Sequence, residues 1–201
     1  MGVRKLLNRV CSYVDVNPEL IDVEVYSDAH NELRNHLPFY ESSPNGSKGA
    51  GTAIDTNGFK IRVTTSQLRD PSYIVAVIAH EIGHVLLTKN SKITPDTTDF
   101  EQLADLLTVF WGLGIFTANA AFKFTQWSGG GKYGWSSRRH GYLSEQMFGY
   151  SLALFAWIRS EVKPHWTNHL EVNIKHYFKS GLRYLEKTGD TKLKKLMTTS
   201  F

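Results

Sequence analysis

The chain is poor in cysteine and has no long apolar run, and each shortage excludes a class of protein. Cys11 is the one cysteine among 201 residues, so no disulfide can form within the chain. That fits a reducing compartment. No uninterrupted apolar stretch reaches the ~18 residues of a membrane-spanning helix, and residues 1–6 (MGVRKL) lack the apolar core of a secretory signal. We therefore expect a cytoplasmic protein without a membrane partner.

Charged residues are not in excess either. They make up 21% of the chain against 41% hydrophobic and 12% aromatic residues, which is enough apolar material for a sizeable core. The formal net charge is +4, and part of the excess lies near the C-terminus, at Lys187, Lys192, Lys194 and Lys195. A lysine-rich final helix is usually a solvated face, so we do not expect nucleic acid as the partner.

Apolar periodicity predicts a small sheet before residue 70 and a helical remainder, which is an α+β fold. Strands are expected where apolar and polar residues alternate, and Asn57-Gly58 predicts a tight hairpin turn between the last two of them. Asp70 followed by Pro71 predicts the start of a helix that runs to about Leu87. The other expected elements are a helix over 3–14, strands over 21–26, 51–54 and 59–65, and helices over 99–111, 115–124, 144–160 and 167–187.

The expected helix after Pro71 carries the motif H-E-x-x-H, formed by His80, Glu81 and His84. The two histidines are one helical turn apart on one face, so both imidazoles can reach one metal ion. Glu81 lies beside them, where a carboxylate can take a proton from a metal-bound water. The alternative is a chance pentapeptide in a core helix. The rest of the helix is apolar nearly all round, however, and buried polar groups without partners are costly.

A catalytic zinc site usually takes a third protein ligand. The longer metzincin motif, H-E-x-x-H-x-x-G-x-x-H, is absent, because Leu87 and Asn90 occupy the positions of its Gly and its last His. Glu101 and Asp105 are better candidates, since they share one face of the next, otherwise apolar helix. We expect Glu101 to bind the metal and Asp105 to accept a hydrogen bond from the second ring nitrogen of His80. In the alternative, Glu101 caps the start of its own helix.

Together, the H-E-x-x-H motif and the later E-x-x-x-D of Glu101 and Asp105 resemble the gluzincin metallopeptidases. The short spacer between the two motifs is most similar to small scaffolds of the ImmA/IrrE or minigluzincin type. The resemblance covers about residues 50–112 and gives no function for the chain beyond them. It implies a zincin-like fold, in which a small antiparallel sheet packs on the motif helix. It also implies glutamate as third zinc ligand and aspartate behind a ligand histidine.

These residues predict a zinc-dependent metallopeptidase that hydrolyses peptide bonds in a peptide or protein substrate, with Glu81 as general base. Gluzincins of the thermolysin kind stabilise the oxyanion with a tyrosine and a histidine, and Tyr142 and His140 are the candidates for that role here. The strand over 59–65 is expected to receive extended substrate along its edge.

Two further interpretations stay open. One is hydrolysis of a non-peptide amide. The other is a non-catalytic, zinc-stabilised scaffold whose helical, basic C-terminal part binds a protein or nucleic-acid partner. An intact Glu81 favours catalysis, because a structural zinc site does not need a general base. In each case we expect a zincin-like metal-binding core over residues 1–124, followed by a loop and helical subdomain over 125–201.

Overall fold

The structure, a computed structural model, describes residues 2–26, 50–55, 58–65, 67–89, 93, 97–127, 143–161 and 163–189. It divides into two compact units, Met1–Phe100 and Glu101–Phe201, and we describe each unit by itself. The expected boundary at residue 124 falls inside α5 (Gly114–Trp127), within the second unit. Whether residues 1–124 and 125–201 act as separate functional parts stays a prediction.

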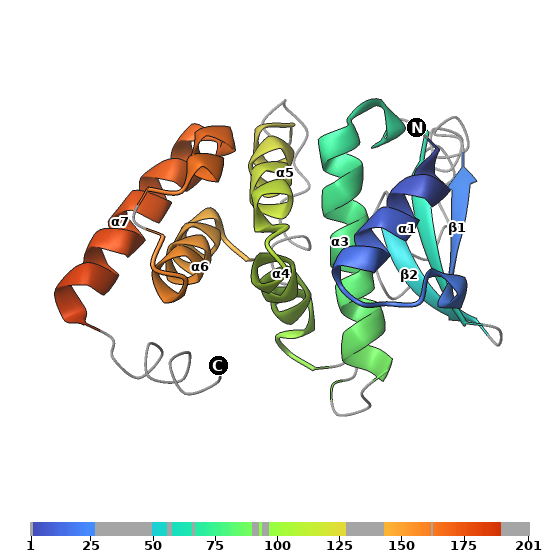
Figure 1. Ribbon diagram of the computed structural model, residues 1–201. Helices are drawn as coiled ribbons and strands as arrows, with labels where there is room; N and C mark the ends of the chain where they lie inside the picture. The colour runs from blue at the N-terminus through green and yellow to red at the C-terminus, as the bar shows by residue number, and fades with distance from the viewer. Residues whose placement is uncertain are drawn as a thin grey trace. The chain divides into compact units, whose positions relative to one another are not determined.

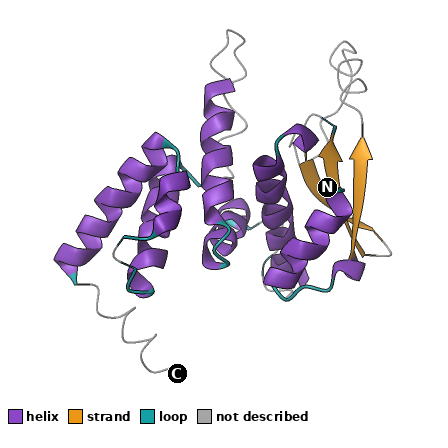
Figure 2. Ribbon diagram, turned by 45° about the horizontal axis from the view of Figure 1, so that its top comes forward, coloured by secondary structure: helices purple, strands orange, loops and turns teal. Residues whose placement is uncertain are grey.

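The first unit is a three-stranded sheet with helices on one side of it. Figures 1 and 2 show α1 and α3 next to each other on the same side of the sheet. The elements predicted for residues 3–87 are confirmed within about two residues. They are α1 (Val3–Tyr13), β1 (Ile21–Tyr26), β2 (Ala50–Asp55), β3 (Gly58–Thr64) and α3 (Pro71–Lys89), with short 3-10 turns over Pro18–Leu20 and Gln67–Arg69.

The sheet is mixed, so the expectation of an antiparallel sheet is wrong at β1. β2 and β3 form the predicted antiparallel hairpin, with Ile54 opposite Phe59, while β1 runs parallel to β3, with Val23 opposite Ile61. Alternation of apolar and polar residues identifies a strand but carries no information on its direction. Residues 27–49 separate β1 from the hairpin, which leaves both directions open to it. Asn57 of the predicted turn lies outside the described residues.

β3 is the central strand of the order β1-β3-β2, which overturns the expectation that it receives substrate along an edge. It pairs with β1 on one side and with β2 on the other over nearly its whole length. Its side chains Ile61 and Val63 are fully buried. Strand addition by a peptide needs a free edge, and in this sheet only β1 and β2 are at an edge.

α3 begins where the sequence predicts. The Asp70 side chain accepts hydrogen bonds from the backbone N–H groups of Ser72 (3.0 Å) and Tyr73 (3.1 Å), which would otherwise lack partners in the first turn. Pro71 opens the helix, where its missing N–H costs nothing. This cap fixes the register of α3 and therefore which of its residues face α1 and the sheet.

α3 is the one helix in the described part of the chain that is long and apolar enough to cross a membrane, with a mean hydropathy of 1.3. However, 56% of this apolar stretch is buried inside the protein, and the residues from Ala76 to Val85 are buried without a break. A core helix of a folded unit has this same composition.

The second unit is helical. It contains α4 (Phe100–Phe110, beginning at the last residue of the first unit), α5, α6 (Glu145–Ile158) and α7 (Val172–Thr188), with a 3-10 segment over His165–His169. The first three helices agree with the sequence prediction, and Ser144 caps α6 by accepting from Met147 N–H at 3.2 Å. The last helix starts later than the predicted residue 167, because residues 165–169 form the tighter 3-10 turn. It ends as predicted at Gly189, which is left-handed with φ 58°.

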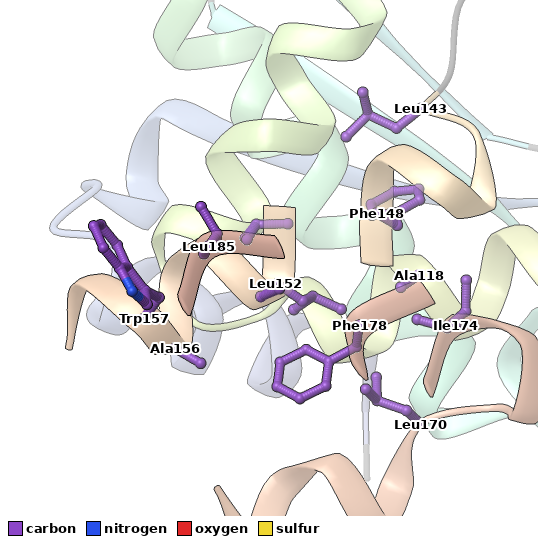
Figure 3. Packing of buried hydrophobic residues seen from close by; sticks show 12 residues of the cluster. Ala118, Leu143, Phe148, Leu152, Ala156, Trp157, Leu170, Ile174, Phe178 and Leu185 are labelled. Atoms are coloured by element: carbon purple, nitrogen blue, oxygen red, sulfur yellow. The ribbon is translucent and has the colours of Figure 1, made fainter. Parts of the chain in front are cut away.

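The core of the second unit lies mainly between α6 and α7, which run side by side (Figure 1). Figure 3 shows its packing, in which Phe148, Ile174 and Leu185 are almost fully buried. Glycine allows the two helices to approach closely. A Cβ at Gly149 would overlap Tyr177 Cβ and lie 2.9 Å from Phe178 N, and one at Gly181 would lie 3.1 Å from Ala153 Cβ.

Substitution of Gly149 by Ala is therefore expected to destabilise the second unit. Alanine favours an isolated helix by ~1 kcal/mol, but here its methyl group must push α7 backbone atoms away, and overpacking of this kind costs about 1–3 kcal/mol net. Urea unfolding measures the change. Ser180→Ala, at an exposed position of α7, is the matched control and should change the free energy of unfolding by less than ~0.5 kcal/mol. A higher midpoint for Gly149→Ala would show that the helices are not in close contact.

The thiol of Cys11 is expected to be unreactive in the folded protein. The side chain is fully buried in α1. Burial raises the pKa of Cys11 from its ordinary 9.0 to about 11, and the charge of Arg4 opposes this only in part. Because alkylating reagents attack the thiolate, iodoacetamide at pH 8 should modify the native protein about a hundredfold more slowly than the guanidinium-unfolded protein. Mass spectrometry over time measures both rates, and equal rates would contradict the burial of Cys11.

The same shift in pKa gives an alkaline dependence of stability. The unfolded thiol loses its proton near pH 9.0, while the folded thiol keeps it to about pH 11. The free energy that the protonated Cys11 thiol contributes to folding is therefore fully present below about pH 9 and is lost as the pH rises towards 11.

Candidate metal centre

Three polar residues lie in the most deeply buried part of α3. His80, Glu81 and His84 are each more than nine-tenths buried, among apolar neighbours such as Ile78 and Ile82 that are fully buried. The apolar residues around the whole helix explain this burial, because no face of α3 is polar enough to be left in water. A buried imidazole or carboxylate is tolerated only when it is hydrogen-bonded or bound to a metal.

The two histidines face each other across one helical turn. Nε2 of His80 lies 3.0 Å from Nε2 of His84, and the ring planes are nearly perpendicular, at 89°. A tetrahedral ion with bonds of about 2.0–2.2 Å holds its ligand atoms about 3.3–3.6 Å apart. The two nitrogens therefore need to move by only a few tenths of an ångström to share one metal ion.

Glu101 supplies the third donor. One ring nitrogen each from His80 and His84 and one carboxylate oxygen of Glu101 all lie within 4.8 Å of one another. Chain connectivity accounts for this proximity, because Phe100 directly precedes Glu101 and its ring stacks on His84 with centroids 4.6 Å apart and planes at 23°. These three residues can hold a metal ion. Among the described residues, no other three histidine, cysteine or carboxylate side chains bring their ligand atoms close enough together to hold one ion.

The set of donors fits a metal chemically. Two imidazole nitrogens and one carboxylate oxygen are a common protein ligand set for zinc, and they leave a coordination position open. Glu81 is buried beside the two histidines but does not belong to the three-donor group. Glu81 thus differs from the three residues that could hold an ion.

Asp105 is only 3% exposed and lies one turn after Glu101 on α4. Its Oδ2 accepts a hydrogen bond from the backbone N–H of Leu143 at 2.9 Å. The backbone C=O of Asp105 accepts from the Thr108 hydroxyl at 2.7 Å. The carboxylate thereby joins α4 to the residues that lead into α6. Its expected hydrogen bond with His80 stays a prediction.

Sequence reasoning missed Phe100 and Leu143 as parts of this arrangement. For Phe100, one feature of the sequence pointed to the site, namely its position immediately before a candidate ligand. For Leu143 no feature did, because it acts through its backbone N–H, which every residue except proline carries. Both contacts join residues that are distant in the chain.

The other candidates from the sequence divide into two sets. Tyr142 and His140, expected to stabilise an oxyanion, lie outside the described residues. His30, Glu32 and His36 also lie outside the described residues. In the second unit, His165, His169 and His176 are exposed.

Comparisons of the chain with models of protein families, with curated proteins and with solved structures find no match. The functional argument therefore rests on the chemistry of the residues described above.

The three-donor group leads to a direct prediction for metal binding. The protein should bind about one zinc ion. Loss of a residue that only hydrogen-bonds to a metal ligand can lower metal affinity by up to ~100-fold. Loss of a ligand itself, in His80→Ala or His84→Ala, should lower the affinity further. Glu101→Gln should weaken it as well, because the amide is a poorer ligand than the carboxylate. Competition with a chromophoric chelator measures the affinity. His176→Ala, at an exposed histidine of α7, is the control and should bind zinc like the wild type. Equal affinity in all four variants would exclude this site.

Proposed function

We propose that the protein is a zinc-dependent metallopeptidase that acts on peptides or proteins. One observation carries the proposal: Nε2 atoms of His80 and His84 face each other at 3.0 Å in a buried helix, with the carboxylate of Glu81 buried beside them. Ligands alone would serve a structural site equally well. The additional buried carboxylate is what a hydrolytic site requires and a structural site does not.

The proposed metal is zinc, and the proposed relationship is to the gluzincins. Two histidines and a carboxylate also occur in non-haem iron sites, so the ligand set alone does not choose the metal. Glu81 favours zinc, because it follows His80 directly, as in the H-E-x-x-H motif of zinc peptidases. The order of hairpin, motif helix and glutamate-bearing helix supports a zincin-like fold, although the sheet is mixed.

The residues would divide the chemistry as follows. His80, His84 and Glu101 would hold the ion, which when bound would supply Lewis-acid chemistry to a carbonyl group and to water. Glu81 would take a proton from the attacking water and pass it to the leaving amine nitrogen. Burial of Glu81 places this transfer in a low dielectric, where electrostatic interactions are stronger than in water. We keep Tyr142 and His140 as the proposed partners of the oxyanion, and the cytoplasm as the proposed location.

Glu81→Gln separates catalysis from metal binding. The amide keeps the shape of the side chain but cannot accept the proton, so hydrolysis should fall by about 10²–10⁴-fold while zinc stays near one per chain. Mass spectrometry of peptide libraries and of unfolded proteins, incubated with the zinc-loaded protein, measures cleavage. Glu19→Gln removes the same charge from an exposed position and should leave cleavage unchanged.

Two results would contradict the proposal. If Glu81→Gln cleaves as fast as the wild type, the activity does not come from this site. If the zinc-loaded wild type cleaves no peptide or protein in such a screen, the non-catalytic scaffold becomes the better interpretation.

A further inference from the structure

α7 carries a row of cations with a regular spacing. Lys175, Lys179, Arg183 and Lys187 follow one another at intervals of four residues. Each step advances ~6 Å along the helix and ~40° around it, so the four side chains form one slanted stripe about 18 Å long. The last three are exposed and Lys175 is half-buried. We call these four residues the basic stripe.

The basic stripe points away from the core. The side of α7 that packs into the unit is formed by Ile174, Phe178, Gly181 and Leu185, all buried. Helical periodicity places Lys179, Arg183 and Lys187 on the other side of α7 from these residues, and places Lys175 at the margin of the packed face. α7 is therefore a helix with one apolar face used for packing on α6 and one basic face left to solvent.

No ion pair of the described residues involves the basic stripe. Elsewhere, Arg62 pairs with Glu24 and Arg159 pairs with Glu161. Glu186 is the one carboxylate within α7. Lys175 contacts a neutral group, Asn168 Oδ1, at 3.4 Å. Like charges four residues apart destabilise a helix. Glu186 stands three residues after Arg183 and Glu171 stands four residues before Lys175, so these two carboxylates offset part of the stripe's four positive charges.

Exposed aromatic rings lie next to the basic stripe. Tyr184 is 56% exposed and stands three residues before Lys187, which makes the two side chains neighbours on the helix surface. Its ring meets that of Tyr150 on α6, itself 38% exposed, with centroids 6.3 Å apart. An exposed tyrosine ring offers a flat surface on which a nucleic-acid base can stack.

We propose that this face of α7 binds single-stranded nucleic acid, with the basic stripe on the phosphates and Tyr184 stacked on a base. The stripe's four cations, spread over ~18 Å, can each contact one phosphate of a strand. Stacking on Tyr184 needs an unpaired base, which favours a single strand over a duplex. An anionic membrane fits less well, because the apolar face of α7 is packed on α6 and cannot enter a bilayer.

This proposal does not rest on the proposed peptidase function. The residues it uses belong to α6 and α7 of the second unit, whereas zinc binding and proton transfer are assigned to His80, Glu81, His84 and Glu101. Nucleic-acid binding and peptide hydrolysis can therefore be tested, and can fail, separately.

The first test measures the charge contribution. Fluorescence anisotropy with a labelled single-stranded oligothymidine of about 20 nucleotides gives the affinity at several salt concentrations. Four phosphate contacts predict a log–log slope of about −2.8, or an ~50-fold loss of affinity between about 50 and 200 mM salt. Lys179→Gln combined with Arg183→Gln should halve that slope to about −1.4. The matched control is Lys5→Gln with Arg9→Gln, which removes the same two charges from exposed positions of α1 and should leave the slope unchanged.

The second test separates a nucleic acid from other polyanions. Tyr184→Ala should weaken oligothymidine binding at least about fivefold, and Tyr184→Phe should not, because phenylalanine keeps the stacking surface. Neither change should affect binding of heparin, which has no bases. Urea unfolding midpoints verify that each variant is folded.

Three results would overturn the proposal. The first is no salt-dependent binding of the oligonucleotide. The second is equal loss of affinity in the α7 and α1 double variants, which would show that only net charge matters. The third is unchanged binding in Tyr184→Ala together with binding of phosphatidylserine vesicles that depends on the basic stripe, which would make a membrane surface the partner.

Discussion

Burial of two imidazoles and a carboxylate in α3 is the constraint on which the first unit depends. The helix is apolar nearly all round, so it must be covered, and α1 and the three-stranded sheet provide that cover. Covering it also removes His80, Glu81 and His84 from water, and polar groups in that position require partners. The Nε2 atoms of the two histidines contact each other, and together with Glu101 these residues could hold a metal ion. The core of the unit and its candidate chemistry thus have one origin, and a change in the packing of α3 would affect both.

The residues at the start of α4 extend that constraint through chain connectivity. Phe100 stacks on His84, and the following residue, Glu101, brings a carboxylate within 4.8 Å of the histidine nitrogens. One turn later Asp105 accepts the N–H of Leu143. The first turns of α4 therefore carry both the candidate ligand, Glu101, and the buried carboxylate of Asp105.

The second unit is built on a different principle. α6 and α7 approach closely because Gly149 and Gly181 have no side chain, and this packing uses the whole apolar face of α7. What remains of α7 is basic and aromatic. The sequence alone led us not to expect nucleic acid, because lysines near a C-terminus are usually solvated. The structure adds exposed rings beside the cations, and no ion pair of the described residues involves those cations. These two observations favour nucleic acid as a partner of this helix.

The sequence by itself determined what depends on neighbouring residues. It determined the H-E-x-x-H helix, its Asp70 cap, the β2–β3 hairpin, the Ser144 cap and the Gly189 stop, because each follows from side chains within about four positions. Only the tertiary structure decided the parallel direction of β1, the central place of β3, the ring of Phe100 on His84 and the hold of Asp105 on the Leu143 backbone. These features join residues far apart in the chain. They are fixed by which surfaces can be buried together, and local patterns of apolar and polar residues do not contain that information.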